Sequence, residues 1–455
     1  RGGSGWNMRE KINTSDYLFN SRALLKMIWP LIFEQFLAIA VGLADSVMVA
    51  SVGEAAVSAV SLIDTIMVLV INAFTALATG GAIVAGQYLG QKNQEEGCRT
   101  AAQLILVSFV VSTSLMTVLY LCKGFILHVV FGEINSDVMT NCDTYLMIVT
   151  ASIPFLALYD AGAAVHRCMG DSQTPMIISL AMNGLNVVGN AALLYGLNWG
   201  IEGAAVPSLI SRAFAACWMV YLLRDTSKTL HIRNLSQFRP NHGLIKEILH
   251  VGVPYSFENS MFQLGKILVL SLVSRLGTAS ITANAVGNSV SIFPILAGNA
   301  MGYVLSAVTA QCVGAGDYRQ VRYYTQKLII MTYIGNWIMC FLLYLLLPGL
   351  ISAYQLQLET ALLAKQVILY YGVCVMLIWP LSFILPCTLR ASSDTAFCMV
   401  VSMLSMWVFR VGLSFLLIYK LEIGVLGVWI AMTLDWAVRS LVFLIRYRGI
   451  RWQMK

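Results

Sequence analysis

The 455-residue chain is 58% hydrophobic and only 11% charged, with a mean hydropathy of +0.75. This is too much apolar and too little charged surface for a soluble protein of this length, so lipid must surround most of the chain. We interpret the net charge of +7 as a signal of membrane topology, which gives no reason to expect a nucleic-acid partner.

Twelve apolar stretches are long enough to cross ~30 Å of hydrocarbon, which requires about 20 residues of helix. Their approximate ranges are 22–50, 55–86, 101–122, 142–166, 175–198, 201–223, 244–274, 279–312, 324–349, 362–389, 396–419 and 424–446. The apolar runs are continuous and do not alternate, which excludes a β-barrel. The sequence therefore predicts an all-α membrane protein with twelve transmembrane helices. The longest stretches predict bending at internal prolines such as Pro30 and Pro254.

The second half of the chain repeats the first half at an offset of 224 residues. The matched pairs are Pro30 and Pro254, Glu34 and Glu258, Gly53 and Gly277, Ala59 and Ala283, Gln87 and Gln311, Gly90 and Gly314, and, near the end of each half, Tyr195 and Tyr419, Gly203 and Gly427. Six spans in each half make both halves enter the membrane from the same side. We therefore predict two pseudo-symmetric six-helix lobes, related by an axis along the membrane normal.

The most polar long segment between spans is residues 224–243, which we predict to be a linker between lobes 22–223 and 244–446. An N-terminal segment (1–21) and a tail (447–455) complete the chain. Most basic residues between spans lie on the side of the linker and of both chain ends. By the positive-inside rule this side is cytoplasmic, and the short loops favour the plasma membrane of a bacterium, its inner membrane.

Ionisable residues inside spans cost ~2.5–3.5 kcal/mol each on insertion scales, so each one requires a partner or a function. They are Glu34, Asp45, Asp64, Asp160, Arg212, Glu258, Lys266, Arg410, Asp435 and Arg439. Asp435 and Arg439 are one helical turn apart, and we predict that they pair.

Asp45 lies deep in the first span, in VGLADSVMVASVG, with no basic residue within a turn or two. An isolated acid there holds a proton for part of the time unless a cation replaces it. We interpret Asp45 as a proton or sodium switch; the alternative is a carboxyl hydrogen-bonded to neighbouring helices for packing. The second lobe has Val269 at the matching position, so the two lobes differ in chemistry here.

The fifth span carries Asn186 and Asn190, which share one helix face. Two amide oxygens and the Asp45 carboxylate would coordinate sodium, or would hold a protonated carboxyl by hydrogen bonds. The asparagines alone equally fit interhelical packing. Their counterparts in the second lobe are Arg410 and Ser414.

Glu34 and Glu258 each follow a proline by four residues. Two hypotheses remain open for them: an architectural role, such as binding backbone groups that the proline frees, and a role in substrate or cation binding. Lys266 lies eight residues after Glu258 on nearly the same face, and we predict that it is the partner of this acid.

The order and spacing of several motifs resemble the multidrug and toxic compound extrusion (MATE) transporters. The motifs are Pro30…Glu34-Gln35…Gly42-x-x-Asp45-x-x-Met48-Val49, Gly86-Gln87-x-x-Gly90, Arg167-x-x-Gly170-Asp171-x-x-x-Pro175 and Gly200-x-x-Gly203-Ala204-Ala205. The resemblance covers about residues 22–446. It implies a V-shaped pair of lobes that exports amphipathic, often cationic compounds in exchange for sodium or protons.

In similar transporters the cation site lies in the first lobe, and its positions correspond to Asp45, Asn186, Asn190 and Ser208 here. Asn190 stands where the family pattern has a second acid, which favours protons over sodium. The tenth span has no carboxylate before Leu389-Arg390, so a cation site in the second lobe would depend on Glu258 alone. Pro30 corresponds to the proline at which the first helix of similar transporters bends.

We predict a cation-coupled antiporter that works by alternating access and needs no cofactor beyond its coupling ion, H+ or Na+. The expected partners are a small amphipathic substrate and membrane lipid, and we expect a monomer. The alternative is a flippase for a lipid-linked saccharide or another amphipathic lipid, which would favour an arginine-rich cavity. The sequence has no His-Glu-x-x-His or Gly-x-Ser-x-Gly motif, so we do not predict an enzyme. A channel would be distinguished by the lack of uphill flux.

Overall fold

A computed structural model of the chain describes residues 17–132 and 135–453. Throughout this part of the chain the regular structure is helical, with no strand. The expectations for residues 1–16 and 454–455 fall outside the described residues. Helices satisfy their own backbone hydrogen bonds, which is the requirement that lipid imposes on a spanning segment.

The first lobe contains eight α-helices and two short π-helical segments. These are α1 (Ser21–Ala50), α2 (Glu54–Gly90), α3 (Gln94–Leu121), α4 (Lys123–Phe125), η2 (Ile126–Val130), α5 (Ser136–Ala151), α6 (Ile153–Cys168), α7 (Gln173–Ala191), η3 (Ala192–Gly196) and α8 (Glu202–Leu222). Asparagine caps begin three of them: the side chains of Asn20, Asn93 and Asn135 accept hydrogen bonds from Ala23 N, Glu96 N and Asp137 N, respectively.

The linker contains the short helix η4 (Leu235–Phe238), and the second lobe follows it. Its helices are α9 (His242–Val273), η5 (Ser274–Leu276), α10 (Thr278–Val290), α11 (Ile292–Gly314), α12 (Tyr318–Ala353), α13 (Leu358–Leu377), α14 (Trp379–Phe383), α15 (Leu385–Ala391), α16 (Thr395–Ser405), η6 (Met406–Leu413), α17 (Ser414–Tyr419), α18 (Val425–Arg448) and η7 (Arg451–Gln453).

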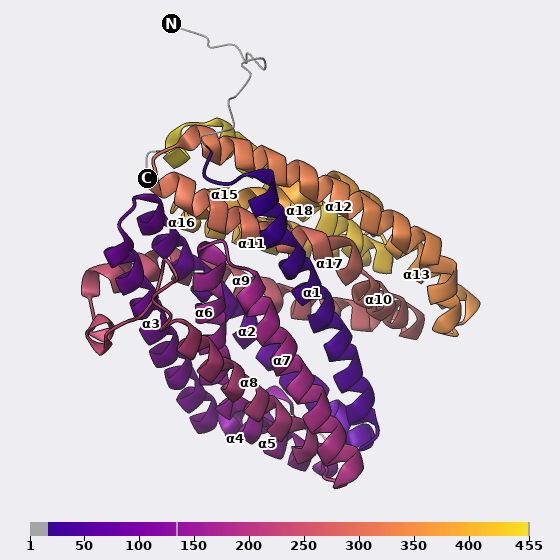
Figure 1. The fold of residues 1–455 in the computed structure, drawn as a ribbon. Coiled ribbons are helices and arrows are strands. Elements are labelled where there is room, and N and C mark those ends of the chain that lie inside the picture. The colour runs from indigo at the N-terminus through magenta and orange to yellow at the C-terminus, as the bar shows by residue number, and fades with distance from the viewer. Residues whose placement is uncertain (1–16, 133–134, 454–455) are drawn as a thin grey trace, which may run out of the picture.

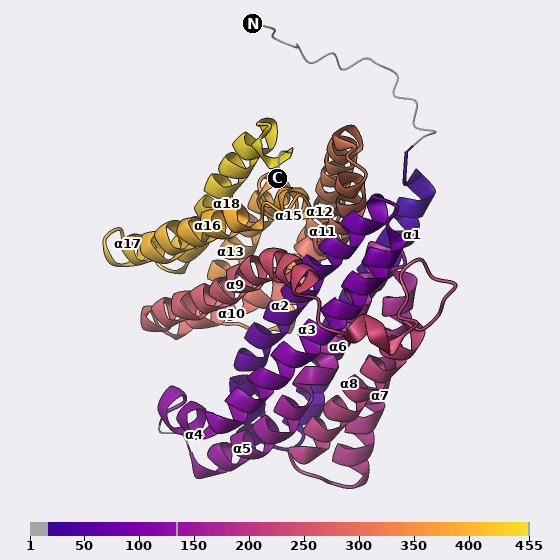
Figure 2. The ribbon, with the colours of Figure 1, turned by 90° about the vertical axis from the view of Figure 1, so that its left-hand side faces the viewer.

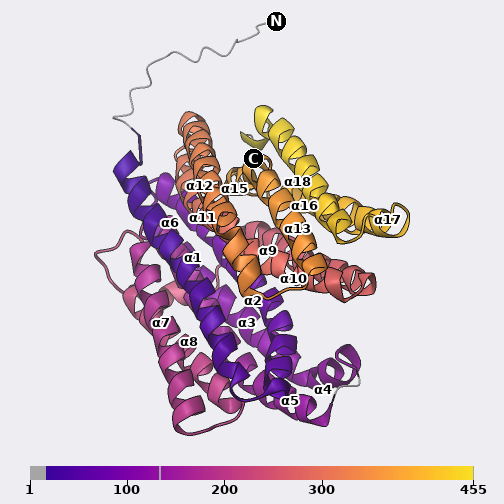
Figure 3. The same cartoon turned by 90° about the vertical axis from the view of Figure 1, so that its right-hand side faces the viewer.

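The two lobes lie against each other near the chain ends and diverge away from them, as Figures 1 and 2 show. The contact between lobes is made mainly by α2, which packs against α9 and α11. At the α2–α9 crossing a side chain on Gly80 would overlap the backbone of Gly252, so only glycine permits this close approach. Figure 3 shows α1 and α12 side by side at this end, and α1 also contacts α11. The predicted V-shaped pair of lobes is confirmed.

Every one of the twelve predicted ranges contains helix, although not every one passes a test of length and apolar composition. Among the described residues, ten helices are long and apolar enough to cross a membrane, and the bent pair of α5 and α6 makes up to eleven. The remaining predicted span, 244–274, forms the 32-residue helix α9. Polar residues such as Glu258 and Lys266 lower its hydropathy, and α9 tolerates them because it packs against protein on several sides.

The prolines at which bending was predicted do not interrupt their helices. Helices α1 and α9 run through Pro30 and Pro254. The structure instead breaks before Pro154, between α5 and α6 with a bend of 41°, and before Pro380 and Pro386, at the starts of α14 and α15. A proline in the first turn of a helix costs no hydrogen bond, which explains why these breaks are tolerated.

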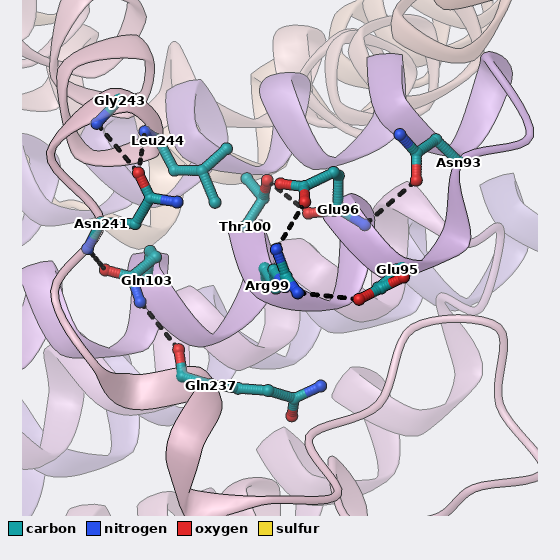
Figure 4. A network of polar contacts seen from close by, with 10 residues as sticks. All are labelled: Asn93, Glu95, Glu96, Arg99, Thr100, Gln103, Gln237, Asn241, Gly243 and Leu244. Atoms are coloured by element: carbon teal, nitrogen blue, oxygen red, sulfur yellow. Dashed lines mark hydrogen bonds and ion pairs between the residues drawn. The ribbon is translucent and has the colours of Figure 1, made fainter.

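The described chain ends and the linker lie at one end of the molecule. Leu18 N donates to Gln320 Oε1 at 3.0 Å, and the rings of Tyr318 and Trp452 lie 5.7 Å apart, so the start of α12 contacts both chain ends. The linker packs on α3, where Gln103 Nε2 donates to the Gln237 carbonyl at 2.8 Å (Figure 4). We call this the terminal end.

Candidate functional site

The structure brings the four predicted cation-site residues of the first lobe together. Asn190 Nδ2 donates to Asp45 Oδ1 at 2.9 Å and lies 3.4 Å from Asn186 Oδ1. When the Asn186 amide is turned so that its nitrogen faces the carboxylate, it donates to both Asp45 oxygens at 3.0 and 3.1 Å and accepts from Ser208 Oγ at 2.9 Å. Helices α1, α7 and α8 thus contribute to one connected polar cluster.

One oxygen of this cluster is left without a donor. Asn190 is 2% exposed, and its Oδ1 has no hydrogen-bond partner among the described residues. A buried unpaired oxygen is costly, of the order of 1–3 kcal/mol. A proton on Asp45 or a cation beside it would provide the missing interaction. The cluster combines one carboxylate with amide and hydroxyl oxygens, which are donors that suit a hard cation.

Three further charged residues surround the site, and the sequence assigned no role to them. Arg212 lies within electrostatic reach of Asp64, Asp160 and Asp45, and its Nη1 donates to Ser152 Oγ at 2.7 Å, at the break between α5 and α6. Thr75 donates to Asp160 at 2.9 Å. The first lobe therefore holds two more carboxyls, although Asn190 replaces the second acid of the family pattern. The only available signal was their position inside predicted spans.

Glu34 and Glu258 form matching ion pairs, each with an arginine. Arg167 Nη2 lies 2.7 Å from Glu34 Oε1, and Arg390 Nη2 lies 2.7 Å from Glu258 Oε1, with all four side chains at least partly buried. The structure contradicts the prediction that Lys266 is the partner of Glu258. Lys266 lies two turns further along α9, about 12 Å by the helical rise, whereas α15 brings Arg390 alongside the acid. The repeat contained this signal, because the two arginines recur at nearly the offset of the two glutamates.

These pairs predict a specific pattern of stability. We expect Glu34→Gln or Arg167→Gln alone to lower the free energy of unfolding by about 3–5 kcal/mol, because each leaves an uncompensated buried charge. The double variant should lose less than the sum of the two, since it leaves no charge behind. Denaturation of the purified protein in detergent measures all three, with the Glu258–Arg390 pair as the matched comparison. Additive losses would contradict a direct pairing.

At the terminal end the two lobes exchange matching contacts. Gln87 Nε2 of α2 donates to the Ala391 carbonyl at 2.7 Å, and Gln311 Nε2 of α11 donates to the Cys168 carbonyl at 2.5 Å. Beside them, Gly90 packs on the backbone of Gln311 and Gly314 packs on that of Gln87, where a side chain on either glycine would overlap the facing carbonyl. The repeated Gln-x-x-Gly motif therefore closes the lobes against each other.

The loop after α6 ties the first lobe to the linker. Lys228 Nζ lies 2.7 Å from Asp171 Oδ2, His166 Nδ1 lies 3.5 Å from the same oxygen, and Thr174 Oγ1 donates to it at 2.7 Å. Partial burial opposes ionisation of Asp171, but the hydrogen bonds from Lys228 and Thr174 and the nearby His166 ring outweigh it and hold the pKa of this carboxyl well below its usual range.

The lowered pKa of Asp171 predicts how an Asp171→Asn variant depends on pH. A depressed pKa in the folded state stabilises the fold at every pH above the unfolded value, about 3.9, and this stability is lost as the pH falls below it. We expect the free energy of unfolding of the variant to be lower by about 1–2 kcal/mol at pH 7. The loss is modest because Lys228 is partly exposed. Melting temperatures should differ at pH 5 and converge as the pH falls below about 4. An equal difference at pH 5 and pH 3 would count against this assignment.

Comparison with known proteins identifies the family. The MatE family model matches residues 30–192 and 254–416, two segments displaced by the same 224 residues at both ends, from 30 to 254 and from 192 to 416. The chain is 23% identical over 450 residues to the uncharacterized transporter YisQ of Bacillus subtilis, covering 95% of each protein. It is 26% identical over 419 residues to the probable multidrug resistance protein YoeA of the same organism, covering 89% of this chain and 88% of the relative. The probable multidrug resistance protein NorM of Thermotoga maritima is 21% identical over 445 residues, covering 95% of this chain and 93% of the relative.

Solved structures share the fold. A multidrug resistance MATE family transporter of the MOP superfamily in an outward-facing conformation superposes with a TM-score of 0.86 at 18% identity, covering 95% of this chain and 96% of that one. A MATE structure in the straight conformation gives 0.87 at 19% identity, covering 95% and 97%. The predicted family and fold are confirmed. The chain thus belongs to the MatE family, and it is a multi-pass membrane transporter and not an enzyme.

Proposed function

We propose that the protein is a cation-coupled antiporter that exports amphipathic, often cationic compounds across the plasma membrane, with both chain ends in the cytoplasm. One observation carries the proposal. The connected cluster of Asp45, Asn186, Asn190 and Ser208 ends in an unpaired buried oxygen, and it occurs in only one of two otherwise matched lobes. A proton or sodium ion supplies what this oxygen lacks.

The proton is favoured over sodium because the cluster has one carboxylate and not two. A monovalent cation needs dense oxygen coordination to replace its water, and an additional negative charge strengthens its binding. A proton needs only one acceptor for the hydrogen bond that a neutral carboxyl donates, and Asn190 Oδ1 fits that role. Asp64 on α2 and Asp160 on α6 lie within electrostatic reach of Arg212, as Asp45 does.

The export direction and the substrate class follow the named relatives. YoeA and NorM are described as probable multidrug resistance proteins, and MATE structures exist in bent and straight conformations. The matched Gln-x-x-Gly contacts at the terminal end support alternating access, because they close one side of a two-lobed molecule while the other side diverges.

Uphill efflux of a fluorescent cationic dye from proteoliposomes tests the proposal, with pH and sodium gradients imposed separately. We expect a pH gradient to drive the dye against its concentration gradient. If one proton exchanges for one monovalent dye cation, no net charge moves, and each pH unit supports about a tenfold dye gradient. Flux that is indifferent to both gradients would overturn the antiporter and favour the flippase.

A further inference from the structure

The second lobe gathers three cationic side chains around one aromatic ring. The Phe262 ring of α9 has Lys266 Nζ at 5.1 Å, Arg410 Cζ at 4.7 Å and Arg439 Cζ at 5.7 Å from its centroid. The Arg439 guanidinium also lies 4.6 Å from the centroid of Phe383 on α14. The three cations come from three different spans, those of α9, η6 and α18, so tertiary structure and not helix periodicity brings them together.

Among the described residues, one carboxylate, that of Asp435, faces the two guanidiniums. Asp435 Oδ1 lies 3.4 Å from Arg439 Nε, as predicted from their spacing, and it also accepts a hydrogen bond from Ser405 at 2.6 Å. Three cations and one carboxylate leave an excess of two positive charges: Lys266 is exposed, and the buried guanidiniums of Arg410 and Arg439 have, in the part of the chain that the structure describes, only Asp435 to balance them. Uncompensated charge of one sign is costly at this depth, so the cluster lacks a partner of opposite sign.

Buried hydrogen-bond donors without acceptors also indicate that a partner is missing here. Arg410 and Arg439 are 6% and 3% exposed, and Arg410 Nη1, Arg439 Nη2 and the indole Nε1 of Trp436 have no acceptor within the described chain. Among the described residues of this cluster, Asp435 Oδ2 is the only unpaired carboxylate oxygen. Donors therefore outnumber acceptors at this place, which is the composition of a site for an oxygen-rich anion.

The cluster occupies the position in the second lobe that the cation cluster occupies in the first. Arg410 is the counterpart of Asn186 at the 224-residue offset, and Lys266 stands on the helix that corresponds to the one carrying Asp45. The charged residues inside the spans also differ between the lobes: acids predominate in the first lobe and bases in the second. The first lobe has Glu34, Asp45, Asp64 and Asp160 against Arg167 and Arg212, and the second has Glu258 and Asp435 against Lys266, Arg390, Arg410 and Arg439.

We propose that Lys266, Arg410 and Arg439 bind an anionic oxygen group, a carboxylate or phosphate, of an amphipathic compound. The exposed Lys266 meets the anion first, and the two buried guanidiniums provide the donors that now lack acceptors. Resting on the proposed transport function, this assigns a zwitterionic or anionic substrate class to the second lobe, in addition to the cations expected of the family. Few basic residues lie inside the spans, but three of them gather at this one place.

A matched pair of dyes tests the site by equilibrium binding. Rhodamine 19 carries a free carboxylate and is a zwitterion, whereas rhodamine 6G is its ethyl ester and a cation. Fluorescence anisotropy with the full chain in phosphatidylcholine nanodiscs measures both affinities. We expect Lys266→Gln and Arg410→Gln each to weaken rhodamine 19 by roughly 10-fold to 100-fold, the loss typical of a hydrogen bond to a charged group, and to leave rhodamine 6G unchanged.

Two controls keep the test decisive. Lys365→Gln removes the same charge from the exposed surface of α13 and should affect neither dye, while Lys266→Arg should restore the binding of rhodamine 19. Lys266 is exposed, so its substitution leaves the fold intact even if Arg410→Gln does not. Equal weakening of both dyes, or no weakening of rhodamine 19, would overturn the site.

The source of the anion is decided in the same assay. Phosphatidylglycerol is added to the nanodisc as a competitor. If it displaces rhodamine 19 from the wild type but does not displace the dye that still binds Lys266→Gln, the anionic group that the site binds is a lipid headgroup phosphate. If it does not displace the dye, the group belongs to the transported compound. Binding needs no gradient, so a wild type that binds the zwitterion but shows no gradient-driven efflux would refute the antiporter and leave the anion site standing.

Discussion

Replacing Asp45 with asparagine is expected to abolish gradient-driven efflux while the protein remains folded. The variant keeps the shape of the side chain and, like a protonated carboxyl, has one acceptor oxygen and one donor group, but it can neither release a proton nor balance a cation. With an imposed gradient of two pH units, the wild type should sustain a dye gradient of up to about 100-fold, and Asp45→Asn should sustain none. Fluorescent dye efflux from proteoliposomes measures both.

The loss must be separated from simple unfolding. Because Asp45→Asn removes a partly buried charge from the membrane interior, we expect its melting temperature in detergent to equal or exceed that of the wild type. Glu54→Gln is a matched control, since it removes an exposed acid at the start of α2 and should leave transport unchanged. Coupled efflux that survives in Asp45→Asn would show that the coupling ion binds elsewhere, with Asp64 and Asp160 the next carboxyls to replace.

The sequence was sufficient to predict much of the fold and part of the site. The 224-residue repeat predicted the two lobes, because every matched pair constrains both halves to one architecture. Asp45, Asn186 and Asn190 were predictable because they are polar exceptions inside apolar spans, and the family resemblance added Ser208. Asp435 and Arg439 were predictable because they lie on one helix, where spacing fixes distance.

Contacts between helices far apart in the chain were not predictable in the same way. The spacing of Lys266 along α9 suggested a pairing with Glu258, but an i,i+8 relation leaves two turns between side chains, and the actual partner Arg390 comes from α15. The basic cluster around Phe262 has the same origin, since its members stand in three spans that only tertiary packing brings together. The breaks before Pro154, Pro380 and Pro386 were not predicted, because the sequence alone does not tell a proline in the first turn of a helix from one in its interior.

The second large effect is expected at the glycines that close the terminal end. Gly90→Ala or Gly314→Ala adds a methyl group that overlaps the carbonyl of Gln311 or Gln87 in the facing lobe. Overpacking of this kind costs about 1–3 kcal/mol, and here the cost falls only on the conformation in which the two lobes touch. The equilibrium should therefore shift away from that conformation by roughly 5-fold to 150-fold, and efflux should fall accordingly because the transport cycle must pass through it.

A native cysteine reports this shift directly. Cys168 is buried and lines the space between the lobes together with Arg167 and Tyr303, so it becomes reachable by a maleimide only when the terminal end opens. We expect its alkylation rate, followed by peptide mass spectrometry, to rise in proportion to the open population in both variants, with the exposed Cys122 as an internal reference for the reagent. Gly184→Ala, on α7 with open space around it, should change neither alkylation nor efflux. Unchanged Cys168 labelling in Gly90→Ala would mean that contacts other than the Gln-x-x-Gly pair hold the lobes together.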